Sequence, residues 1–582
     1  MFSVLAMTTL ERISGAMEPG FLRSQVLGID VEFETPFGRR LMVYADYTAS
    51  GRCLRFIEDY LQEIAAFYAN PHTDDDETGR RTNELLHDAE RRIKQILNAG
   101  PRGCLIACGN GATAAIIRLQ HILGVYLPPA TRQTIEKILD EPGSCIDRST
   151  LHSLIEASRP VVFIGPYEHH ANELSWRESL AETVDVRMDC SGRIDLDDLE
   201  RLLKAPEYQG RPRIGSFSAA SNVTGIRTDV HEIARLLHRH NALACFDYAA
   251  AAPYVDIDMS PSGDPEASLD AVYLSPHKFV GGPGSSGLLA FNERLYDGTL
   301  PPTISAGGTV TYVGLTEQDY VSDIETRESG GTPGTLQTIK AAMALEVQRR
   351  VGAERIDARE KELTSRAIAA WGENEAIEIL GNNEPECRLG IVSFNIRCPD
   401  GRYLHHGFVA TLLNDLFGIQ ARSGCSCAGP YGHRLLGIGA ERSEQYRAAV
   451  RAGHTGIKPG WCRVSLHWLM DDAEADYLID AIDFIARHGR LFLCLYRFEW
   501  ASGTWSHQSW KPTPATLSLD AAIRSEGPPS TVSTEPERRS RYDQCLMEAR
   551  LLADELREVR EHPTPDERLA ELESLCFFTL DP

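Results

Sequence analysis

The stretch YLSPHKFVGGPGSSGLLAF, residues 273–291, decides how the rest of the chain is interpreted. An apolar run ends at Ser275, a single lysine, Lys278, follows it, and a glycine-rich loop comes directly afterwards. A lysine at such a place can form a Schiff base with an aldehyde, and glycines let backbone N–H groups approach an anion closely. Ser275 and His277 add side-chain donors beside the lysine. A surface turn without a ligand can have the same composition, so the motif needs support from the rest of the chain.

Strand-like apolar runs alternate with helical patterns over residues 101–330. Such alternation predicts a mainly parallel sheet with helices on both faces, and ligands of such sheets bind at the loops that follow the strands. The strand-like runs are CLIAC (104–108), VVFIG (161–165), GSFSAAS (215–221), ALACFDY (242–248), AVYLS (271–275) and GLLAF (287–291).

Asp247 ends one of these runs, at the edge of the sheet where ligands collect. Pyridoxal phosphate requires a carboxylate beside its ring nitrogen, because the protonated pyridinium is the electron sink that stabilises a carbanion at the substrate Cα. Asp247 and Lys278 together therefore favour pyridoxal 5'-phosphate as the cofactor. The alternative is an ordinary aspartate that caps a turn at a strand end.

The glycine-rich turn CGNGATAAI, residues 108–116, follows a strand and opens a helix. A helix N-terminus of this kind binds anions, and Thr113 adds a hydroxyl donor. Any nucleotide could use such a turn, but the lysine of the classical phosphate-binding loop is absent from it, which makes a nucleotide the less favoured ligand.

Ten segments, in this order, resemble the fold-type I, class V aminotransferase family, and in particular its cysteine desulfurase and selenocysteine lyase branch. The resemblance covers about residues 40–480. The segments are YADYTASGR (44–52), YANPH (68–72), GNGAT (109–113), EHHAN (168–172), SNVTG (221–225), FDYAA (246–250), SPHK (275–278), RESGGTPG (327–334), ARSGCSCAG (421–429) and CRVS (462–465).

The resemblance implies an α/β fold of the fold-type I pyridoxal-phosphate transferases, with a large, mainly parallel sheet domain and a smaller α+β domain. A C-terminal helical extension follows, with Leu552, Leu556 and Val559 on one face. The expected parts are a lead-in (1–40), a segment contributing to the small domain (41–100), the large cofactor-binding domain (101–334), the small C-terminal domain (335–500), and a linker with a helical tail (501–582).

The resemblance also implies a role for each matching residue around the cofactor. Lys278 would be the Schiff-base lysine, Asp247 would pair with the pyridinium nitrogen, and His169 would stack on the ring and help to move protons. Without its motif, a lone histidine at a strand end would usually be structural. Asn222 would face the ring oxygen. The phosphate would be held by Thr113, Ser275 and His277.

Two arginines are implied at the substrate. Arg463 would clamp the substrate carboxylate, a task that suits a planar and permanently charged fork. Arg422 would assist it or help to shape the pocket entrance. The resemblance implies a small α-amino acid as the substrate.

The segment Cys425-Ser426-Cys427, with His433 nearby, could be interpreted as half of a zinc site. No second pair of ligands stands at the usual spacing, so we expect no metal. The family pattern instead contains Arg-x-Gly-x-x-Cys-Ala, and residues 422–428 match it with Cys427 as the sulfur-accepting nucleophile. This role requires a thiolate on a mobile, partly exposed loop. The alternative is that Cys427 merely packs in the loop.

An acidic cluster at residues 74–76 precedes the long helical pattern TGRRTNELLHDAERRIKQIL. Negative side chains favour the positive end of a helix dipole, so we interpret the cluster as a cap rather than a metal site.

The sequence departs from the family pattern at several positions. A glutamine is usual three residues after the aspartate, but Ala250 stands there, so one hydrogen bond to the cofactor is missing or is supplied elsewhere. Tyr248 stands where glycine is common, and Ala112 where a hydroxyl residue is common. Residues 121–158 form an insertion that could wall the active site or bind a partner, since long surface insertions cost little stability.

The composition limits the classes of partner. The chain has 582 residues with 59 Lys and Arg against 83 Asp and Glu, a formal charge of −24 that repels nucleic acid and anionic lipid. No apolar run is long enough to span a membrane, and the opening residues do not resemble a signal peptide. The scattered cysteines favour a reducing, cytoplasmic setting.

Taken together, the residues and the resemblance lead us to expect a homodimeric pyridoxal-phosphate enzyme, a cysteine desulfurase that produces alanine and a persulfide on Cys427 and serves a sulfur-acceptor protein. One alternative is a class V aminotransferase, epimerase or lyase without sulfur transfer, which Ala250 and the insertion support. Another is a scaffold of the same fold whose catalysis has decayed, although a scaffold has no need for Lys278, Asp247, His169 and Arg463 together.

Overall fold

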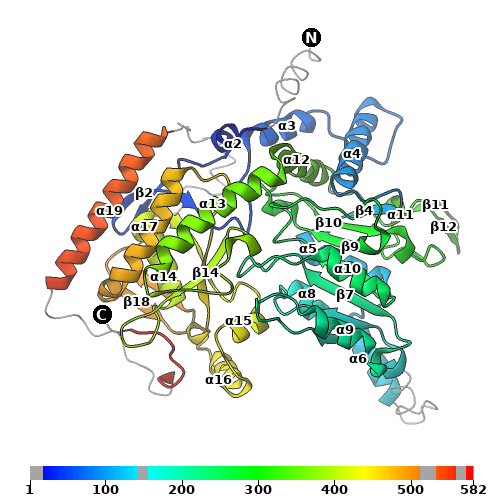
Figure 1. Ribbon diagram of the computed structural model, residues 1–582. Coiled ribbons are helices and arrows are strands. Elements are labelled where there is room, and N and C mark those ends of the chain that lie inside the picture. The colour runs from blue at the N-terminus through cyan, green and yellow to red at the C-terminus, as the bar shows by residue number, and fades with distance from the viewer. Residues whose placement is uncertain (1–16, 141–154, 512–532, 559–571, 581–582) are drawn as a thin grey trace. The chain divides into compact units, whose positions relative to one another are not determined.

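The computed structural model describes residues 17–140, 155–511, 533–558 and 572–580 (Figure 1). These residues form two compact units. The first unit is built mainly from Ser50–Ser221 and Ile226–Ile356. The second is built from Glu18–Ala49, from Asn222–Gly225 and from the described residues that follow Asp357.

A seven-stranded sheet, with the order β4-β10-β9-β8-β7-β5-β6, is the centre of the first unit. All neighbouring strands are parallel except β10, which runs antiparallel to both β4 and β9. The predicted mainly parallel α/β sheet is therefore confirmed. The strands are β4 (Gly103–Cys108), β5 (Val161–Ile164), β6 (Glu182–Asp185), β7 (Arg213–Ser218), β8 (Leu243–Asp247), β9 (Ala271–Leu274) and β10 (Gly287–Asn292).

Helices cover both faces of this sheet. Ile214 on β7 packs with Leu119 of α5 and Trp176 of α8 in one core cluster. The next residue, Gly215, points to the opposite face, where a Cβ would lie 2.5 Å from Leu237 of α10. The helices and the hairpin of this unit are α3 (Arg55–Ala65), α4 (Glu77–Ile96), α5 (Gly111–Ile122), α6 (Pro129–Asp140), α8 (Ala171–Arg177), α9 (Leu196–Lys204), α10 (Val230–Arg239), α11 (Ile324–Arg327), α12 (Thr335–Val351), β11 (Val310–Val313) and β12 (Gln318–Tyr320).

The acidic cluster before α4 caps the helix, as the sequence indicated. The Asp76 carboxylate accepts a hydrogen bond from the Gly79 N–H at 2.7 Å, and the Asp74 carboxylate accepts one from the Asn83 amide at 2.7 Å. A helix N-terminus has unpaired backbone N–H groups, and the Asp76 carboxylate satisfies one of them, whereas Asp74 binds a side chain of the helix. Within the insertion predicted at 121–158, α6 is described and residues 141–154 lie outside the described residues.

The second unit contains an antiparallel sheet of order β13-β14-β17-β16 with helices around it, in agreement with the expected α+β architecture. Its elements are α2 (Pro19–Gln25), β1 (Glu32–Thr35), β2 (Gly38–Leu41), β3 (Val43–Tyr44), most of α13 (Ala353–Gly372), β13 (Ile377–Ile379), β14 (Ile391–Ile396), α14 (His406–Phe417), β15 (Ile419–Gln420), β16 (Arg422–Gly424), α15 (Gly429–Leu435), α16 (Ala440–Arg451), β17 (Trp461–Ser465), α17 (Asp472–His488), β18 (Tyr496–Glu499), β19 (Thr504–His507) and α19 (Glu535–Glu558).

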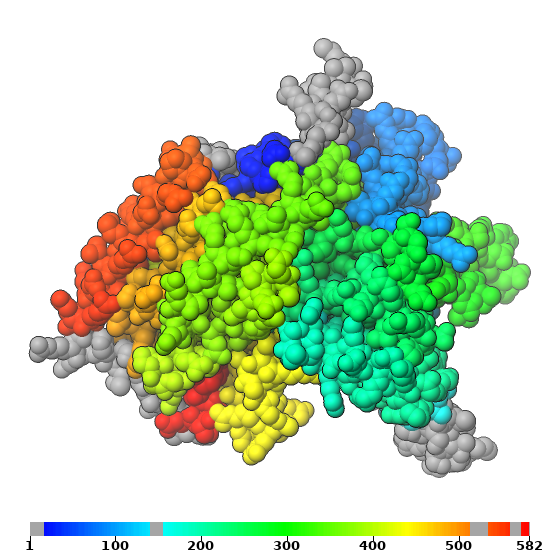
Figure 2. Space-filling model, viewed as in Figure 1, coloured from blue at the N-terminus to red at the C-terminus, as the bar shows by residue number. Residues whose placement is uncertain are grey.

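The C-terminal tail belongs to the core of the second unit. On α19, Tyr542 stacks on Tyr477 of α17, with ring centroids 4.2 Å apart, and Leu546 is buried in the same cluster. Phe578, further along the tail, is fully buried against His405, with ring centroids 4.6 Å apart. The outer side of α19 forms part of the surface in Figure 2, in orange and red.

The apolar face predicted for this tail is confirmed where it is described. Leu556 is buried and Leu552 packs partly buried against the core, whereas Val559 lies outside the described residues, as does most of the predicted linker. Among the described residues, no helix combines the length and the apolar composition that crossing a membrane requires.

Two leucines of α19 provide a matched test of this packing. Leu546 is 7 % exposed and Leu551 is 58 % exposed. Leu546→Ala should lower the free energy of unfolding by about 2–5 kcal/mol, because it opens a cavity in the core, whereas Leu551→Ala should change it by less than about 0.5 kcal/mol. Urea unfolding followed by circular dichroism measures both. Equal effects of the two substitutions would contradict the packing of α19.

Candidate active site

Lys278 lies in the short 3₁₀ turn η3 (Pro276–Lys278), directly after β9. Its backbone N–H donates to the Ser275 carbonyl at 3.0 Å, and its side chain is half-buried. The loop then turns back tightly, because a Cβ on Gly282 would lie 1.8 Å from the Pro276 carbonyl oxygen. Only glycine fits at such a distance, so the glycine-rich run holds the lysine at the carboxyl end of β9.

The N-terminus of α5 meets the same segment. The Ala112 backbone N–H donates to the Ser275 Oγ at 2.9 Å. Gly111 has φ of +61°, and a Cβ there would lie 2.8 Å from the same oxygen. Thr113 stands in the first turn of α5 with an exposed side chain. Two predicted phosphate-binding segments are therefore adjacent at a helix N-terminus, which is a typical arrangement for binding a phosphate group.

His277 adds an uncharged donor to this place. The pKa of His277 is lowered to about 4, first by burial and then by the positive charge of Lys278. Its Nδ1 lies 3.3 Å from the Ser50 hydroxyl, and its carbonyl accepts a hydrogen bond from the Gly51 N–H at 2.9 Å. At neutral pH the imidazole is therefore neutral, and it can bind an anion through a hydrogen bond rather than through charge.

Asp247 ends β8 with only 4 % of its surface exposed. Burial raises the pKa of Asp247, although the hydrogen bond from the Ala249 N–H, at 2.8 Å, and the charge of Lys278 act in the opposite direction. A buried carboxylate is costly unless a cation compensates it. This carboxyl group is therefore suited to a cationic partner such as a pyridinium nitrogen.

Glu168, the first residue of the EHHAN segment, is a second buried carboxyl group in this unit. It accepts hydrogen bonds from the Ser218 N–H at 2.9 Å, the Ser218 hydroxyl at 2.6 Å, the Asn172 amide at 2.7 Å and the Gly165 N–H at 3.2 Å. Burial nevertheless raises the pKa of Glu168 to about 7, and the charge of Asp247 acts in the same direction.

His169 follows Glu168, and its ring is half-buried. The Ala171 N–H donates to the ring Nδ1 at 3.1 Å. Because Nδ1 accepts this bond, the proton of the neutral ring is placed on Nε2. The chain thereby sets which nitrogen of His169 can donate a proton.

Arg463 lies on β17 in the second unit, where Asp46 connects it to Arg422. The Asp46 Oδ1 lies 3.1 Å from Arg463 Nη2, and Oδ2 lies 2.9 Å from Arg422 Nε. Arg463 also donates from Nη1 to the Asn222 carbonyl at 2.8 Å. The two arginines that the sequence predicts at the substrate are thus brought together by a carboxylate that it did not predict.

Cys427 lies on an exposed turn of the second unit. The Ala428 N–H donates to the Cys425 carbonyl at 3.0 Å, and both central residues, Ser426 and Cys427, have positive φ, at 50° and 55°. Residues other than glycine rarely adopt this conformation, so the turn is strained. Ser426 is held from two sides, because its carbonyl accepts from the Asn222 amide at 2.7 Å and its hydroxyl from Trp461 Nε1 at 3.2 Å.

The side-chain amide of Asn222 donates to the turn, and its backbone carbonyl accepts from Arg463. Its Oδ1 is buried and has no hydrogen-bond partner among the described residues. An unpartnered buried oxygen is costly and is usually satisfied by a ligand or a water molecule. Its predicted contact with a ring oxygen stays a prediction.

The residues therefore fall into two sets. The lysine set, in the first unit, comprises Lys278, Asp247, His169, Thr113, Ser275 and His277. The arginine set, in the second unit, comprises Asn222, Arg422, Cys427 and Arg463. Their roles stay predictions, because the contacts show placement and not activity.

Sequence reasoning missed three residues that these sets depend on: Asp46, Glu168 and Trp461. Asp46 and Glu168 stand inside matched segments, YADYTASGR and EHHAN, so a charged residue within a matched segment was the available signal. Trp461 precedes the segment CRVS and carried no such signal.

His433 does not complete a metal site. Its Nδ1 lies 2.8 Å from the Gly429 carbonyl and its Nε2 lies 2.9 Å from the Ser443 hydroxyl, so both ring nitrogens are engaged. No group of three or more metal-ligating side chains occurs in the part of the chain that the structure describes.

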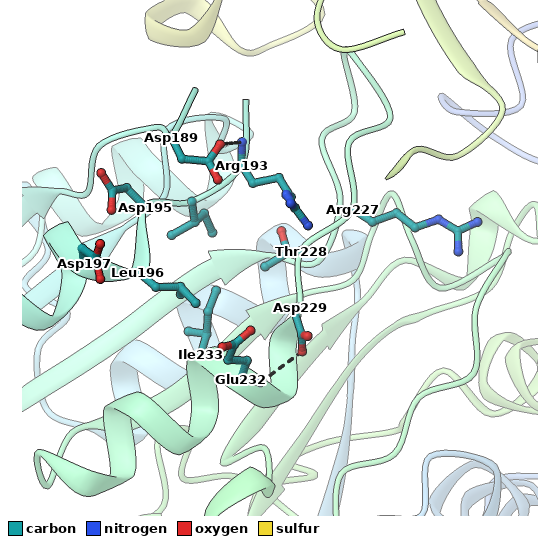
Figure 3. A pocket seen from close by; sticks show the side chains of 11 residues that line it. Asp189, Arg193, Asp195, Leu196, Asp197, Arg227, Thr228, Asp229, Glu232 and Ile233 are labelled. Atoms are coloured by element: carbon teal, nitrogen blue, oxygen red, sulfur yellow. Dashed lines mark hydrogen bonds between the residues drawn. The ribbon is translucent and has the colours of Figure 1, made fainter. Parts of the chain in front are cut away.

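A separate cavity of about 320 Å³ in the first unit contains none of the predicted residues (Figure 3). Three of the carboxylates that line it accept hydrogen bonds from nearby backbone N–H groups. Asp195 and Asp229 cap α9 and α10, and Asp189 accepts from the backbone N–H groups of Ser191 and Arg193. The full lining is Asp189, Arg193, Ile194, Asp195, Leu196, Asp197, Arg227, Thr228, Asp229, Glu232 and Ile233.

The lysine set fits pyridoxal phosphate. It offers an amine for an aldehyde, a buried carboxylate for a pyridinium nitrogen, and a helix N-terminus with hydroxyl and imidazole donors for a phosphate. The close approach at Gly111, where a Cβ would crowd Ser275, keeps that cradle free of side chains.

The fold agrees with that of a known family of enzymes, the class-V aminotransferases. The sequence profile of that family, described as aminotransferase class-V, matches residues 145–478, and the chain belongs to the family. Membership implies pyridoxal phosphate as the cofactor, in agreement with the sequence expectation.

Curated relatives are similar to this chain over most of their length. A probable cysteine desulfurase of Halalkalibacterium halodurans is 29% identical over 354 residues, which is 60% of this chain and 80% of the relative. A probable cysteine desulfurase of Streptomyces coelicolor is 25% identical over 476 residues, covering 80% of this chain and 98% of the relative. The expected resemblance to the cysteine desulfurase branch is confirmed.

Among solved structures, the apo structure of a cysteine desulfurase from Thermococcus onnurineus NA1 superposes with a TM-score of 0.61 at 20% identity. The match covers 81% of this chain and 99% of that chain. This likeness confirms the expected fold class.

The buried Glu168 predicts a pH dependence of stability. Its pKa of about 7 in the folded chain exceeds the ordinary 4.5, so the folded state keeps a proton that the unfolded chain has lost. Stability should therefore fall as the pH rises from about 4.5 to about 7, by up to about 3 kcal/mol. Glu168→Gln should remove this part of the dependence in urea unfolding measured across the range. Parallel profiles for the two proteins would show that Glu168 does not titrate in this way.

Proposed function

We propose that the chain is a cysteine desulfurase, which converts L-cysteine to L-alanine and leaves the sulfur as a persulfide on Cys427. The observation that carries this proposal is the exposed turn at Cys427, in a segment that matches Arg-x-Gly-x-x-Cys-Ala. The similarity to probable cysteine desulfurases supports the same reaction.

The lysine set would bind the cofactor and move protons. When bound, pyridoxal phosphate supplies an electron sink for the substrate Cα. Lys278 would be its attachment point, and the buried carboxylate of Asp247 would keep the ring nitrogen protonated. The amine of Lys278 and Nε2 of His169 would exchange protons with the substrate, since Nδ1 of His169 is already engaged by the Ala171 N–H. The phosphate would be held by Thr113, Ser275 and His277.

The arginine set would bind the substrate carboxylate and take its sulfur. Arg463 would clamp the carboxylate, and Arg422 would assist it. The Cys427 thiolate would attack the substrate sulfur, so that a sulfur–sulfur bond forms and the substrate carbon–sulfur bond breaks. The electron pair of that bond stays with the substrate, whose Cβ gains a proton on the way to alanine. The reaction balances without an external oxidant, because alanine is the reduced product and the persulfide the oxidised one.

The two cysteines of the turn allow a matched test. Cys427→Ser should lower alanine and sulfide formation from L-cysteine, in the presence of a thiol reductant, by about 100-fold or more, because it removes the nucleophile. Cys425→Ser changes the same turn and should keep the rate within about threefold. Assays of both products on the cofactor-loaded proteins measure this.

Two results would contradict the desulfurase assignment. One is full activity in Cys427→Ser. The other is a wild-type protein that forms neither product while its visible absorbance responds to other amino acids, which would favour an aminotransferase, epimerase or lyase. Lys278→Ala, which lacks the amine that would attach the cofactor, serves as the control. It should lose the visible absorbance band of the bound cofactor as well as the activity.

We also propose that the chain forms a homodimer and passes its sulfur to an acceptor protein. The hairpin β11–β12 supports an interface between copies, because Tyr312, Val313 and the neighbouring Leu315 are exposed apolar side chains on it. Such clusters often mark contact surfaces. Sedimentation velocity should give the mass of two chains of 64.5 kDa each. The mass of a single chain would overturn the proposed homodimer.

A further inference from the structure

Asp46 stands between the two arginines of the arginine set. Each of its carboxylate oxygens contacts one of them, Oδ1 with Arg463 Nη2 at 3.1 Å and Oδ2 with Arg422 Nε at 2.9 Å. The side chains of Asp46 and Arg463 are 12 % and 4 % exposed, whereas that of Arg422 is 50 % exposed. Two guanidinium groups and one carboxylate meet here, so the three side chains together have a formal net charge of +1.

The backbone holds Asp46 in this place. The preceding residue, Ala45, is bonded on both sides, because its N–H donates to the Gln420 carbonyl at 3.0 Å and its carbonyl accepts from the Ser465 N–H at 2.7 Å. The Asp46 carbonyl accepts from the Ala49 N–H at 3.0 Å. The carboxylate is therefore positioned by the strands around it and not only by the arginines.

The two arginines need such a carboxylate. They are directly opposite each other in the antiparallel pairing of β16 and β17, and like charges at such positions repel. Arg463 is nearly buried, where charges interact more strongly than at the surface. Asp46 supplies a negative charge between them and so relieves this repulsion.

We propose that Asp46 is a specificity-determining residue, which matches the arginine pair to amino acids with a single carboxylate and disfavours those with a second negative group. This inference rests on the proposed role of Arg463 as the carboxylate clamp. Without Asp46, the two guanidinium groups would carry two uncompensated charges and would suit a dianion. With it, the second negative group of a dianion meets a carboxylate, and specificity arises partly from that repulsion.

The test compares two amino acids that differ in charge. L-Alanine and L-aspartate are titrated into the cofactor-loaded protein, and the change in its visible absorbance gives each dissociation constant. Asp46→Asn should raise the affinity for L-aspartate relative to L-alanine by about tenfold, which corresponds to about 1.4 kcal/mol. Neither probe contains sulfur, so a shifted ratio in a protein that does not release sulfide would sustain this inference while the proposed function fails.

Arg422→Ala tests the sign of the effect independently. It removes one positive charge and leaves Asp46 in place, so the affinity for L-aspartate relative to L-alanine should fall by about threefold. This change is smaller than the tenfold rise expected for Asp46→Asn, because the side chain of Arg422 is half-exposed and its charge is screened by solvent. This second variant keeps the inference testable if Asp46→Asn does not fold.

Asp472 is the matched control, because it also connects two arginines of this unit. Its Oδ1 lies 2.9 Å from Arg359 and 2.8 Å from Arg366, at the start of α17. Asp472→Asn should leave the ratio of the two affinities unchanged. A ratio that also stays constant in Asp46→Asn, whether both affinities fall equally or neither changes, would overturn the inference and leave Asp46 with a purely structural role.

Discussion

The first unit depends on the antiparallel strand β10, which runs between β4 and β9. The chain must return from the end of β9 through a tight glycine-rich loop, and β10 then places its first residue against the start of α5. A Cβ on Gly287 would lie 2.3 Å from the Gly111 carbonyl oxygen, so no side chain fits between them. This close approach brings the helix N-terminus, Ser275 and Lys278 to one end of the sheet, and the phosphate-binding and amine-bearing parts of the lysine set both follow from it.

Buried charge is the second constraint, and the two units treat it differently. In the first unit, Glu168 accepts hydrogen bonds from four donors. Asp247 accepts a hydrogen bond from the Ala249 N–H, and the positive charge of Lys278 stabilises its carboxylate. The first unit thus contains a buried carboxylate, that of Asp247, which a further cation would stabilise. In the second unit, the buried Arg463 is compensated by Asp46 within the chain. Sites whose charges are incompletely balanced without a ligand are commonly functional, because structural networks are satisfied internally.

The departures from the family pattern are a few single residues, such as Ala250 in the turn after β8, and longer additional segments elsewhere in the chain. Ala250 is buried and apolar at the place of the usual glutamine, so the first unit loses one polar side chain beside Asp247. The additional C-terminal residues form a helix whose Tyr542 and Leu546 complete the core of the second unit. The extension is thus part of the fold, because its apolar face is buried against α17 and not left as an independent tail.

The sequence by itself determined the local elements and the types of residue that form the lysine set. Apolar runs predicted the strands β4, β5, β7, β8, β9 and β10 of the large sheet. The spacing of strands and glycine-rich turns was sufficient to place Lys278, Asp247 and Thr113 at strand or helix ends. Only the tertiary structure decided that β10 runs antiparallel and that Asp46 contacts Arg463, 417 residues away along the chain. Local patterns reflect the burial of one segment, whereas such pairings depend on how distant segments balance charge and pack together, and no single segment encodes that.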